Sequence, residues 1–253
     1  MVSDTEMRTT FDPAARAKRV LRSLLGEQII GMIDYIRYPD RGAAWGGPFN
    51  GQPVRQALFR EIIATMRPQG IVETGTYLGT TTDFMAQTGL PIFTVETDHR
   101  CYGFVRARFV WGGRNINLLH GDSRAALRKL FDGPLRDLSS RTLFFYLDAH
   151  WNDDLPVAEE IDIVFCRCPS AIVMIDDFQV PSDAGYAYDD YGRGKALVPQ
   201  YIAPAVSAHG LQAFFPSTPS ADEGGMRRGC VVLAKQDSHR LVLGSISLLR
   251  RAA

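Results

Sequence analysis

Acidic side chains stand at the ends of successive short apolar runs in this sequence. They are Glu73, Glu96, Asp122, Asp148 and the adjacent pair Asp176 and Asp177. Carboxylates accept hydrogen bonds from ligand hydroxyls and also hold cations. Packing alone does not explain so many charges directly after apolar segments. These residues are therefore candidates for a binding or catalytic site.

The first of these acids belongs to a turn with two glycines, IVETGTYLGTTTDFMA, at residues 71–86. Gly75 and Gly79 would let backbone N–H groups approach a ligand closely. Their G-x-x-x-G spacing differs from the G-x-G-x-x-G of dinucleotide-binding folds, and Glu73 would repel a pyrophosphate. A cationic ligand fits better, and S-adenosylmethionine carries both a sulfonium and an ammonium group.

The acids after the next two runs extend this candidate cofactor site. Glu96 lies about twenty residues beyond the turn, where an acid accepts the ribose hydroxyls in nucleotide-binding folds. Asp122 is expected at the adenine edge. The predicted cofactor-binding set is Glu73, Gly75, Thr76, Gly79, Thr81, Glu96, Asp122, Ser123 and Asp148.

Asp148, Asp176 and Asp177 are expected at neighbouring strand ends. Like charges so close together need a cation or raised pKa values. A ligand set of oxygen atoms alone favours Mg²⁺, Mn²⁺ or Ca²⁺ over zinc, and Mg²⁺ or Mn²⁺ is the ion expected here. The three residues therefore predict a divalent metal site.

Short apolar runs separated by helix-length segments must position these residues. The runs cover residues 70–73, 91–96, 115–119, 142–147, 171–175, 211–215 and 230–234. Such runs are typical of parallel strands buried on both faces. They predict an α/β Rossmann-like fold, a doubly wound and mostly parallel sheet of seven strands with helices on both faces. Ligands bind at the carboxyl ends of the strands in such sheets.

The N-terminal part has helical rather than strand-like spacing. Apolar residues within 14–36 indicate amphipathic helices, so we expect a helical extension and loop over residues 1–53. The catalytic domain is expected over 54–253, starting with a helix near 54–67. The extension is expected either to cover the site or to form a homodimer contact.

Composition limits the partners. Lys+Arg and Asp+Glu both number 28, so no net positive field favours nucleic acid or an anionic membrane surface. The sequence shows neither a targeting segment nor an apolar run near the roughly 18 residues of a membrane span. The 4 cysteines lack zinc-site spacing. We expect a cytoplasmic protein with reduced thiols and a small-molecule partner.

The motif series resembles that of class I S-adenosylmethionine-dependent methyltransferases. The resemblance rests on ETGTYLG, an acid after the second strand, GDS after the third and an acidic end to the fourth, over roughly residues 68–180. It implies methyl transfer from S-adenosylmethionine. Two other functions stay open: a metal-independent methyltransferase acting on a phenol or small acid, and an NAD-linked oxidoreductase, which the glycine spacing and Glu73 disfavour.

The segments LDAH and IDDF are similar to those of the metal-dependent O-methyltransferases that act on sugars of macrolide and aminocoumarin antibiotics. In that macrocin O-methyltransferase-like family, an aspartate after the fourth strand and a double aspartate after the fifth hold Mg²⁺. The residue two positions past the first ligand is the general base. The resemblance implies catalytic roles for Asp148 and His150 and a sugar or polyol hydroxyl as acceptor. The alternative for His150 is a structural histidine near Trp151.

A segment rich in tyrosine and glycine, residues 181–195, is expected to form a lid over a polar, sugar-like acceptor. Its candidate substrate-binding residues are Tyr186, Tyr188, Tyr191 and Arg193. The alternative is a disordered loop without a functional role.

Overall fold

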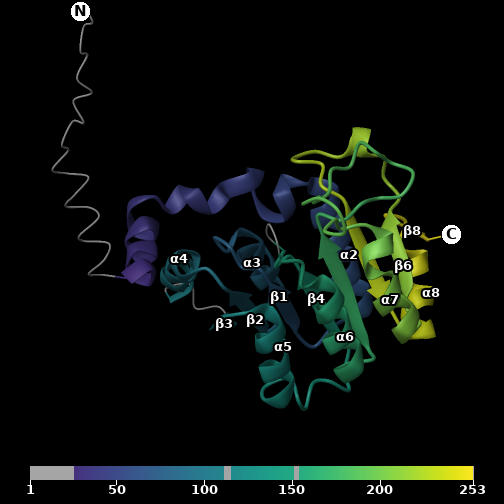
Figure 1. Ribbon diagram of the computed structural model, residues 1–253, viewed down its shortest axis with the longest axis horizontal. Helices are drawn as coiled ribbons and strands as arrows, with labels where there is room; N and C mark the ends of the chain where they lie inside the picture. Colours follow the sequence, from purple (N-terminus) through teal and green to yellow (C-terminus); the bar gives the residue numbers. More distant parts are fainter. Residues whose placement is uncertain (1–25, 111–114, 151–153, 253) are drawn as a thin grey trace, which may run out of the picture.

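The structure is a computed structural model that describes residues 26–110, 115–150 and 154–252. Its centre is an eight-stranded sheet with the order β3-β2-β1-β4-β5-β7-β6-β8 (Figure 1). The strands are β1 (Ile71–Thr74), β2 (Ile92–Glu96), β3 (Ile116–His120), β4 (Leu143–Leu147), β5 (Ala171–Asp176), β6 (Gln212–Pro216), β7 (Cys230–Ala234) and β8 (Leu249–Arg251).

Strands β1 to β5 pair in parallel, whereas β7 runs antiparallel to both β5 and β6. The prediction of a doubly wound, mostly parallel sheet is confirmed. The predicted count of seven strands is corrected to eight, because β8 pairs antiparallel with β6. A strand of 3 residues is too short to give a clear apolar pattern in the sequence.

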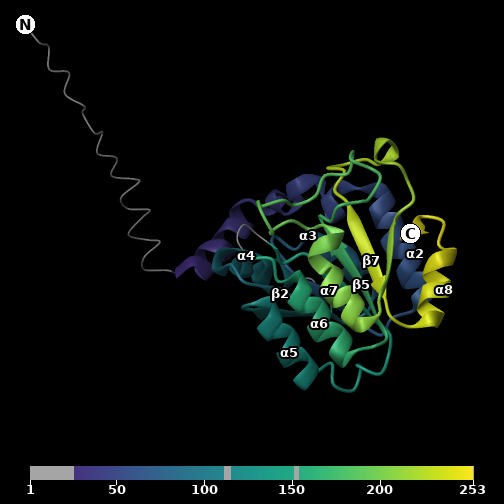
Figure 2. The ribbon, with the colours of Figure 1, turned by 45° about the vertical axis from the view of Figure 1, so that its right-hand side comes forward.

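Helices cover both faces of the sheet (Figures 1 and 2). They are α2 (Pro53–Met66), α3 (Thr80–Met85), α4 (His99–Val110), α5 (Ser123–Asp132), α6 (Val157–Arg167), α7 (Pro199–His209) and α8 (Asp237–Ser245). Short 3-10 helices also occur, among them η1 (Pro39–Gly46) and η2 (Pro48–Gly51). No helix in the described ranges combines the length and the apolar character that a membrane crossing requires.

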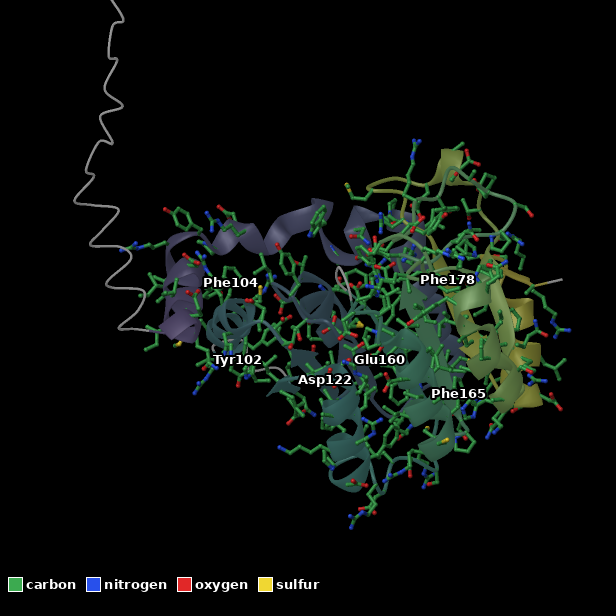
Figure 3. All side chains as sticks on the ribbon, in the orientation of Figure 1. Tyr102, Phe104, Asp122, Glu160, Phe165 and Phe178 are labelled. Atoms are coloured by element: carbon green, nitrogen blue, oxygen red, sulfur yellow. The ribbon has the colours of Figure 1, made fainter. Side chains whose placement is uncertain are left out.

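Alternate residues of the central strands supply two hydrophobic cores. Phe145 of β4 packs with side chains from α5, α6 and α7, and this core includes Phe165 and Phe178, labelled in Figure 3. Phe144 and Tyr146 point to the opposite face and pack with α2, α3 and α8. Burial on both faces explains why the strands read as continuous apolar runs.

The N-terminal segment packs on the main body. Residues 26–37 are helical, and Asp34 of this helix forms an ion pair with Arg100 of α4 at 2.5 Å. Phe49 of η2 is fully buried in the second core, where its ring contacts that of Tyr146. Residues 1–25, which hold part of the predicted amphipathic helices, lie outside the described residues. The homodimer contact stays a prediction.

Candidate active site

The glycine turn after β1 is shaped by contacts that leave no room for side chains. Gly75 has φ 84° and Gly79 has φ 75°, in the left-handed region that favours glycine. A Cβ atom at Gly75 would lie 2.2 Å from the carbonyl oxygen of Asp148, and one at Gly79 would lie 2.7 Å from the ring of Phe109. The turn is therefore held directly against the end of β4 and against α4.

Glu73 lies buried beneath this turn. Its Oε2 atom accepts hydrogen bonds from the hydroxyls of Thr82 and Thr94, both at 2.5 Å. Burial raises the pKa of Glu73 to about 7, although these two hydroxyls oppose the rise. The carboxyl is thus close to ionisation at neutral pH, and a nearby cation would favour its charged form.

Glu96, at the end of β2, closes the same turn from the other side. Its Oε2 accepts the backbone N–H of Tyr77 at 2.6 Å, and its Oε1 accepts that of Asp98 at 2.7 Å. Burial raises the pKa of Glu96 to about 7. A carboxylate has about four lone-pair sites, so both oxygens keep room for ligand hydroxyls.

Three other residues of the predicted cofactor set have partners within the protein. The Thr76 hydroxyl bonds to that of Thr94 at 2.6 Å, and Thr81 Oγ1 accepts the backbone N–H of residue 49 at 3.1 Å. Asp122 caps α5 through the N–H of Ala125 at 3.0 Å. These contacts fix the backbone around the turn.

The carboxylate of Asp122 also contacts the guanidinium of Arg124. The two side chains form an ion pair at 2.7 Å, and the hydrogen bond from Arg124 lowers the pKa of Asp122. Ser123 is buried at the start of α5 and faces Glu160 of α6, labelled in Figure 3. Burial raises the pKa of Glu160 to about 7, while hydroxyls of Ser123 and Thr74 oppose this. No motif in the sequence singled out Glu160.

A cavity of about 510 Å³ adjoins the glycine turn next to Glu96. It is lined by Asp34, Asp40, Arg41, Tyr77, Leu78, Arg100, Cys101 and Phe104. The N-terminal segment and α4 thus meet the turn there. The charged lining residues could not be recognised from the sequence, because they carry no motif and their proximity depends on the packing of the N-terminal helix.

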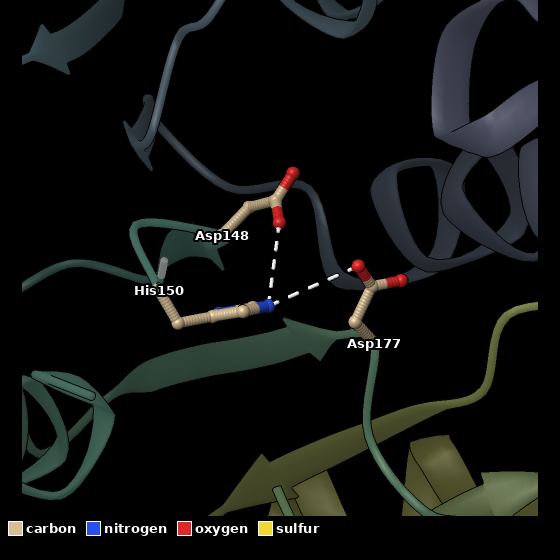
Figure 4. A group of neighbouring side chains, drawn as sticks. All are labelled: Asp148, His150 and Asp177. Atoms are coloured by element: carbon tan, nitrogen blue, oxygen red, sulfur yellow. Dashed lines mark ion pairs between the residues drawn. The ribbon is translucent and has the colours of Figure 1, made fainter. Parts of the chain in front are cut away.

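A second group of polar side chains lies where β4 and β5 end (Figure 4). His150 Nε2 points toward carboxylate oxygens of Asp148 at 3.7 Å, Asp177 at 3.9 Å and Asp189 at 3.5 Å. The His150 side chain is only 1% exposed. Neither of its ring nitrogens has a hydrogen-bond partner among the described residues. A buried donor or acceptor left in this way is costly, which indicates a missing partner at this place.

Asp176 and Asp177 have different surroundings although they are adjacent. Asp176 is fully buried, and its carboxylate pairs with Arg55 of α2 and accepts the Tyr146 hydroxyl at 2.5 Å. Asp177 adopts φ 51° and turns toward His150. Ligand-type atoms of Asp148, His150 and Asp177 lie within 4.8 Å of one another. This cluster contains His150 where the sequence predicted Asp176.

Arg228, just before β7, pairs with two of the acids. Its Nε atom donates to Asp177 Oδ1 at 2.7 Å, and its Nη2 atom donates to Asp189 Oδ1. Although burial opposes it, contacts with His150 and Arg228 lower the pKa of Asp177 to about 2. Asp148 has no such partner in the described residues, and burial together with the neighbouring carboxylates raises its pKa well above the usual range.

The predicted lid is docked at this end of the sheet. Figures 1 and 2 show the segment after β5 beside the loop before β7, and Ala187 forms a bridge with Arg228. Tyr186 is buried and its hydroxyl donates to the carbonyl of Thr218 at 3.0 Å, whereas Tyr191 bonds to Asp189. Tyr188 is partly exposed and Arg193 is exposed. A substrate-binding role for the segment stays a prediction.

No protein-family model and no curated protein sequence matches the chain. Solved structures do match. An O-methyltransferase from Bacillus cereus in complex with S-adenosylhomocysteine shares 13% identity over 87% of this chain and 97% of that one, with a TM-score of 0.55. The O-methyltransferase TomG from Streptomyces achromogenes, in complex with S-adenosylmethionine, shares 15% identity over 87% of this chain and 96% of that one, with a TM-score of 0.50.

The methyltransferase domain of bacterial CtHen1 is a third match, at 12% identity over 72% of this chain and 97% of that domain, with a TM-score of 0.51. At such low identity the likeness establishes the architecture. The chain has a Rossmann-like α/β fold that is similar to the folds of these methyltransferases.

Proposed function

We propose that this chain, which has a methyltransferase fold, transfers a methyl group from S-adenosylmethionine to a hydroxyl oxygen of a small acceptor. One observation carries the proposal. The glycine turn at Gly75 is in contact with Asp148, and Asp148 begins the buried group of acids around His150. A cofactor on the turn would therefore present its methyl group next to residues suited to activating a hydroxyl.

Two buried acids are suited to the two ends of the cofactor. Glu73 lies beneath the turn and would favour the sulfonium and ammonium charges as it ionises. Glu96 keeps lone pairs for the ribose hydroxyls and lies beside the cavity at Tyr77. Neither carboxylate would favour the pyrophosphate of NAD.

The charges around His150 support a divalent cation. When a cation ionises Asp148, the residues Asp148, Asp177 and Asp189 carry three negative charges, and Arg228 supplies one positive charge. Asp176 is already paired with Arg55. Two negative charges thus remain when His150 is neutral, which suits Mg²⁺ or Mn²⁺ held by Asp148 and Asp177. Such an ion lowers the pKa of an oxygen that it coordinates.

His150 is the proposed general base. Its Nε2 atom accepts the proton of the acceptor hydroxyl while an oxygen lone pair forms a bond to the methyl carbon. The carbon–sulfur bond breaks, its electron pair stays on sulfur, and S-adenosylhomocysteine leaves. The nearby carboxylates stabilise the imidazolium that results. We propose a sugar or related polyol as acceptor, because partly exposed Tyr188 and exposed Arg193 offer hydrogen bonds near this end of the sheet.

Calorimetric titration with S-adenosylmethionine, S-adenosylhomocysteine and NAD tests the cofactor. Both sulfur compounds should bind, and tighter binding of NAD would instead support an oxidoreductase. Chelation with EDTA should abolish methyl transfer to a surrogate sugar, and Mg²⁺ or Mn²⁺ should restore it. Full activity after exhaustive chelation would favour the metal-independent enzyme acting on a phenol or small acid.

The variant His150→Ala separates a base from a metal ligand. As a base, its loss should lower kcat by about 10²–10⁴-fold while Mn²⁺ still binds. Loss of Mn²⁺ binding would make the histidine a ligand, and unchanged turnover would make it structural. His209→Ala is a suitable control, because His209, at the end of α7, bonds to Asp162 of α6 at 2.9 Å and does not belong to the group formed by Asp148, His150 and Asp177.

A further inference from the structure

Asp189 is brought to the site by the segment that links β5 to α7. Its backbone N–H donates to the carbonyl of Asp177 at 3.0 Å, and its own carbonyl accepts the N–H of Leu197 at 2.9 Å. The residue is therefore held beside the end of β5, although it follows Asp177 by a dozen positions. Its side chain is 18% exposed and points inward.

The two carboxylate oxygens of Asp189 have different surroundings. Oδ1 pairs with Arg228, which also pairs with Oδ1 of Asp177. Oδ2 accepts the hydroxyl of Tyr191 and lies 3.5 Å from His150 Nε2, which is also 3.9 Å from Asp177 Oδ2 and 3.7 Å from Asp148 Oδ1. Thus Arg228 holds the outer oxygens, and the inner oxygens converge on a buried imidazole that has no partner in the described part of the chain.

We infer that Asp189 is a further ligand of the divalent ion, so that the ion also fixes the segment 181–195 over the site. The inference rests on the metal site of the proposed function. Oxygen ligands lie about 2.1 Å from Mg²⁺, which places adjacent ligands about 3 Å apart and opposite ligands about 4 Å apart. Each of the three carboxylates has an oxygen within 3.9 Å of His150 Nε2, and ligand-type atoms of Asp148, His150 and Asp177 lie within 4.8 Å of one another, so side-chain movements would bring the oxygen of Asp189 into the coordination shell of an ion beside His150.

Asp189 also completes the charge balance at the ion. With Arg228 on the outer side and Asp148 ionised by the cation, Asp148, Asp177 and Asp189 leave a net charge that one divalent ion neutralises. Without the ion, Arg228 links Asp189 to Asp177, and the ion would add a second link between the segment and the strand ends. Binding of the ion and closure of the segment are thus coupled through this side chain.

Mn²⁺ binding measured by electron paramagnetic resonance tests the inference without any acceptor. Asp189→Asn should weaken Mn²⁺ binding by at least about tenfold, since even residues that only support a ligand cost 10–100-fold. Asp190→Asn is the matched control, because the side chain of Asp190 is exposed and accepts the N–H of Gly192 at 2.9 Å. Its affinity should equal that of the unmodified protein.

A double variant separates ligation from an indirect effect through Arg228. If Asp189 acted only by occupying Arg228, the freed guanidinium would compete for Asp177, and Asp189→Asn combined with Arg228→Gln would regain Mn²⁺ affinity. The inference predicts no such recovery. Recovery, or an unchanged affinity in Asp189→Asn, would overturn it.

Hydrogen exchange supplies a second readout. Mn²⁺ should slow exchange of backbone amides in residues 181–195 of the unmodified protein and of Asp190→Asn, but not of Asp189→Asn. Equal protection in all three proteins would refute the coupling while leaving the metal site intact. Absence of Mn²⁺ binding in the unmodified protein would refute both the proposed metal site and this inference.

Discussion

Affinity for S-adenosylmethionine should rise with pH up to neutrality. Burial raises the pKa values of Glu73 and Glu96 from 4.5 to about 7, so both carboxyls are mostly protonated in the free protein near pH 5.5. A cationic cofactor and its ribose hydroxyls interact best with ionised carboxylates. Binding at low pH must therefore release protons, and it becomes more favourable as the pH approaches 7.

The size of the effect follows from proton linkage. Each carboxyl that loses its proton on binding changes the dissociation constant by up to about tenfold per pH unit below its pKa. From pH 5.5 to 7, one group accounts for about thirty-fold and two groups for about a thousand-fold at most. Partial protonation of the bound state reduces both values, so we expect a decrease of about ten- to a hundred-fold in the dissociation constant.

Calorimetry of both sulfur compounds over this range measures the effect. The amino group of the ligand titrates near about 7.7–8.0, so the series should stop at pH 7. Glu73→Gln should reduce the slope for S-adenosylmethionine more than for S-adenosylhomocysteine, which lacks the sulfonium charge. Glu27→Gln on the exposed N-terminal helix is the control. A dissociation constant that is independent of pH, or equal slopes in Glu73→Gln and the control, would refute the reasoning.

The stability of the ligand-free protein should decrease, rather than increase, as the pH rises toward neutrality. The folded state holds protons on Glu73 and Glu96 that the unfolded chain loses above pH 4.5, so their contribution to stability is full below that pH and is lost as the pH rises through about 7. The Tm should fall across this window, and added S-adenosylmethionine should offset the fall at pH 7.

Two further substitutions test the framework of the site. Arg55→Met leaves Asp176 charged and buried, which should lower the free energy of unfolding, measured by urea titration, by about 3–5 kcal/mol. The control Arg60→Met, on the same helix, should lower it by less than about 1 kcal/mol. Equal losses would contradict the role of the buried pair. Gly75→Ala forces a Cβ against the Asp148 carbonyl and should weaken both cofactor and Mn²⁺ binding in calorimetry. In the control Gly89→Ala, the residue has a similar φ of 74° but open space around it, so binding should be retained. Equal effects of the two substitutions would show that backbone strain alone is responsible.

Local sequence patterns were sufficient to predict most strands of the sheet and the order of the elements that carry the site. Seven of the eight strands read as apolar runs, and in β1, β2, β4, β5 and β7 the cause is burial of every residue, which local composition reports directly. The G-x-x-x-G turn could also be predicted from the sequence. Its glycines adopt positive φ values and meet neighbouring atoms that would clash with a side chain, a requirement that only glycine fulfils.

Which charged residues come into contact depends on the packing of elements that are distant in the sequence. Asp176 and Asp177 are indistinguishable in sequence, yet successive strand residues point to opposite faces and Asp177 leaves the strand with a positive φ. Asp176 is therefore directed to Arg55, and Asp177 to His150. No local pattern encodes this choice, since it depends on α2 packing beneath β5.

Long-range contacts also assembled the rest of the site. Asp189 and Arg228 come from different loops, and their ion pair forms only because those loops pair at one end of the sheet. The cavity beside Tyr77 likewise depends on the N-terminal helix lying against α4. Apolar periodicity is a property of neighbouring residues in the chain, whereas ion pairs and cavities arise from segments that folding brings together.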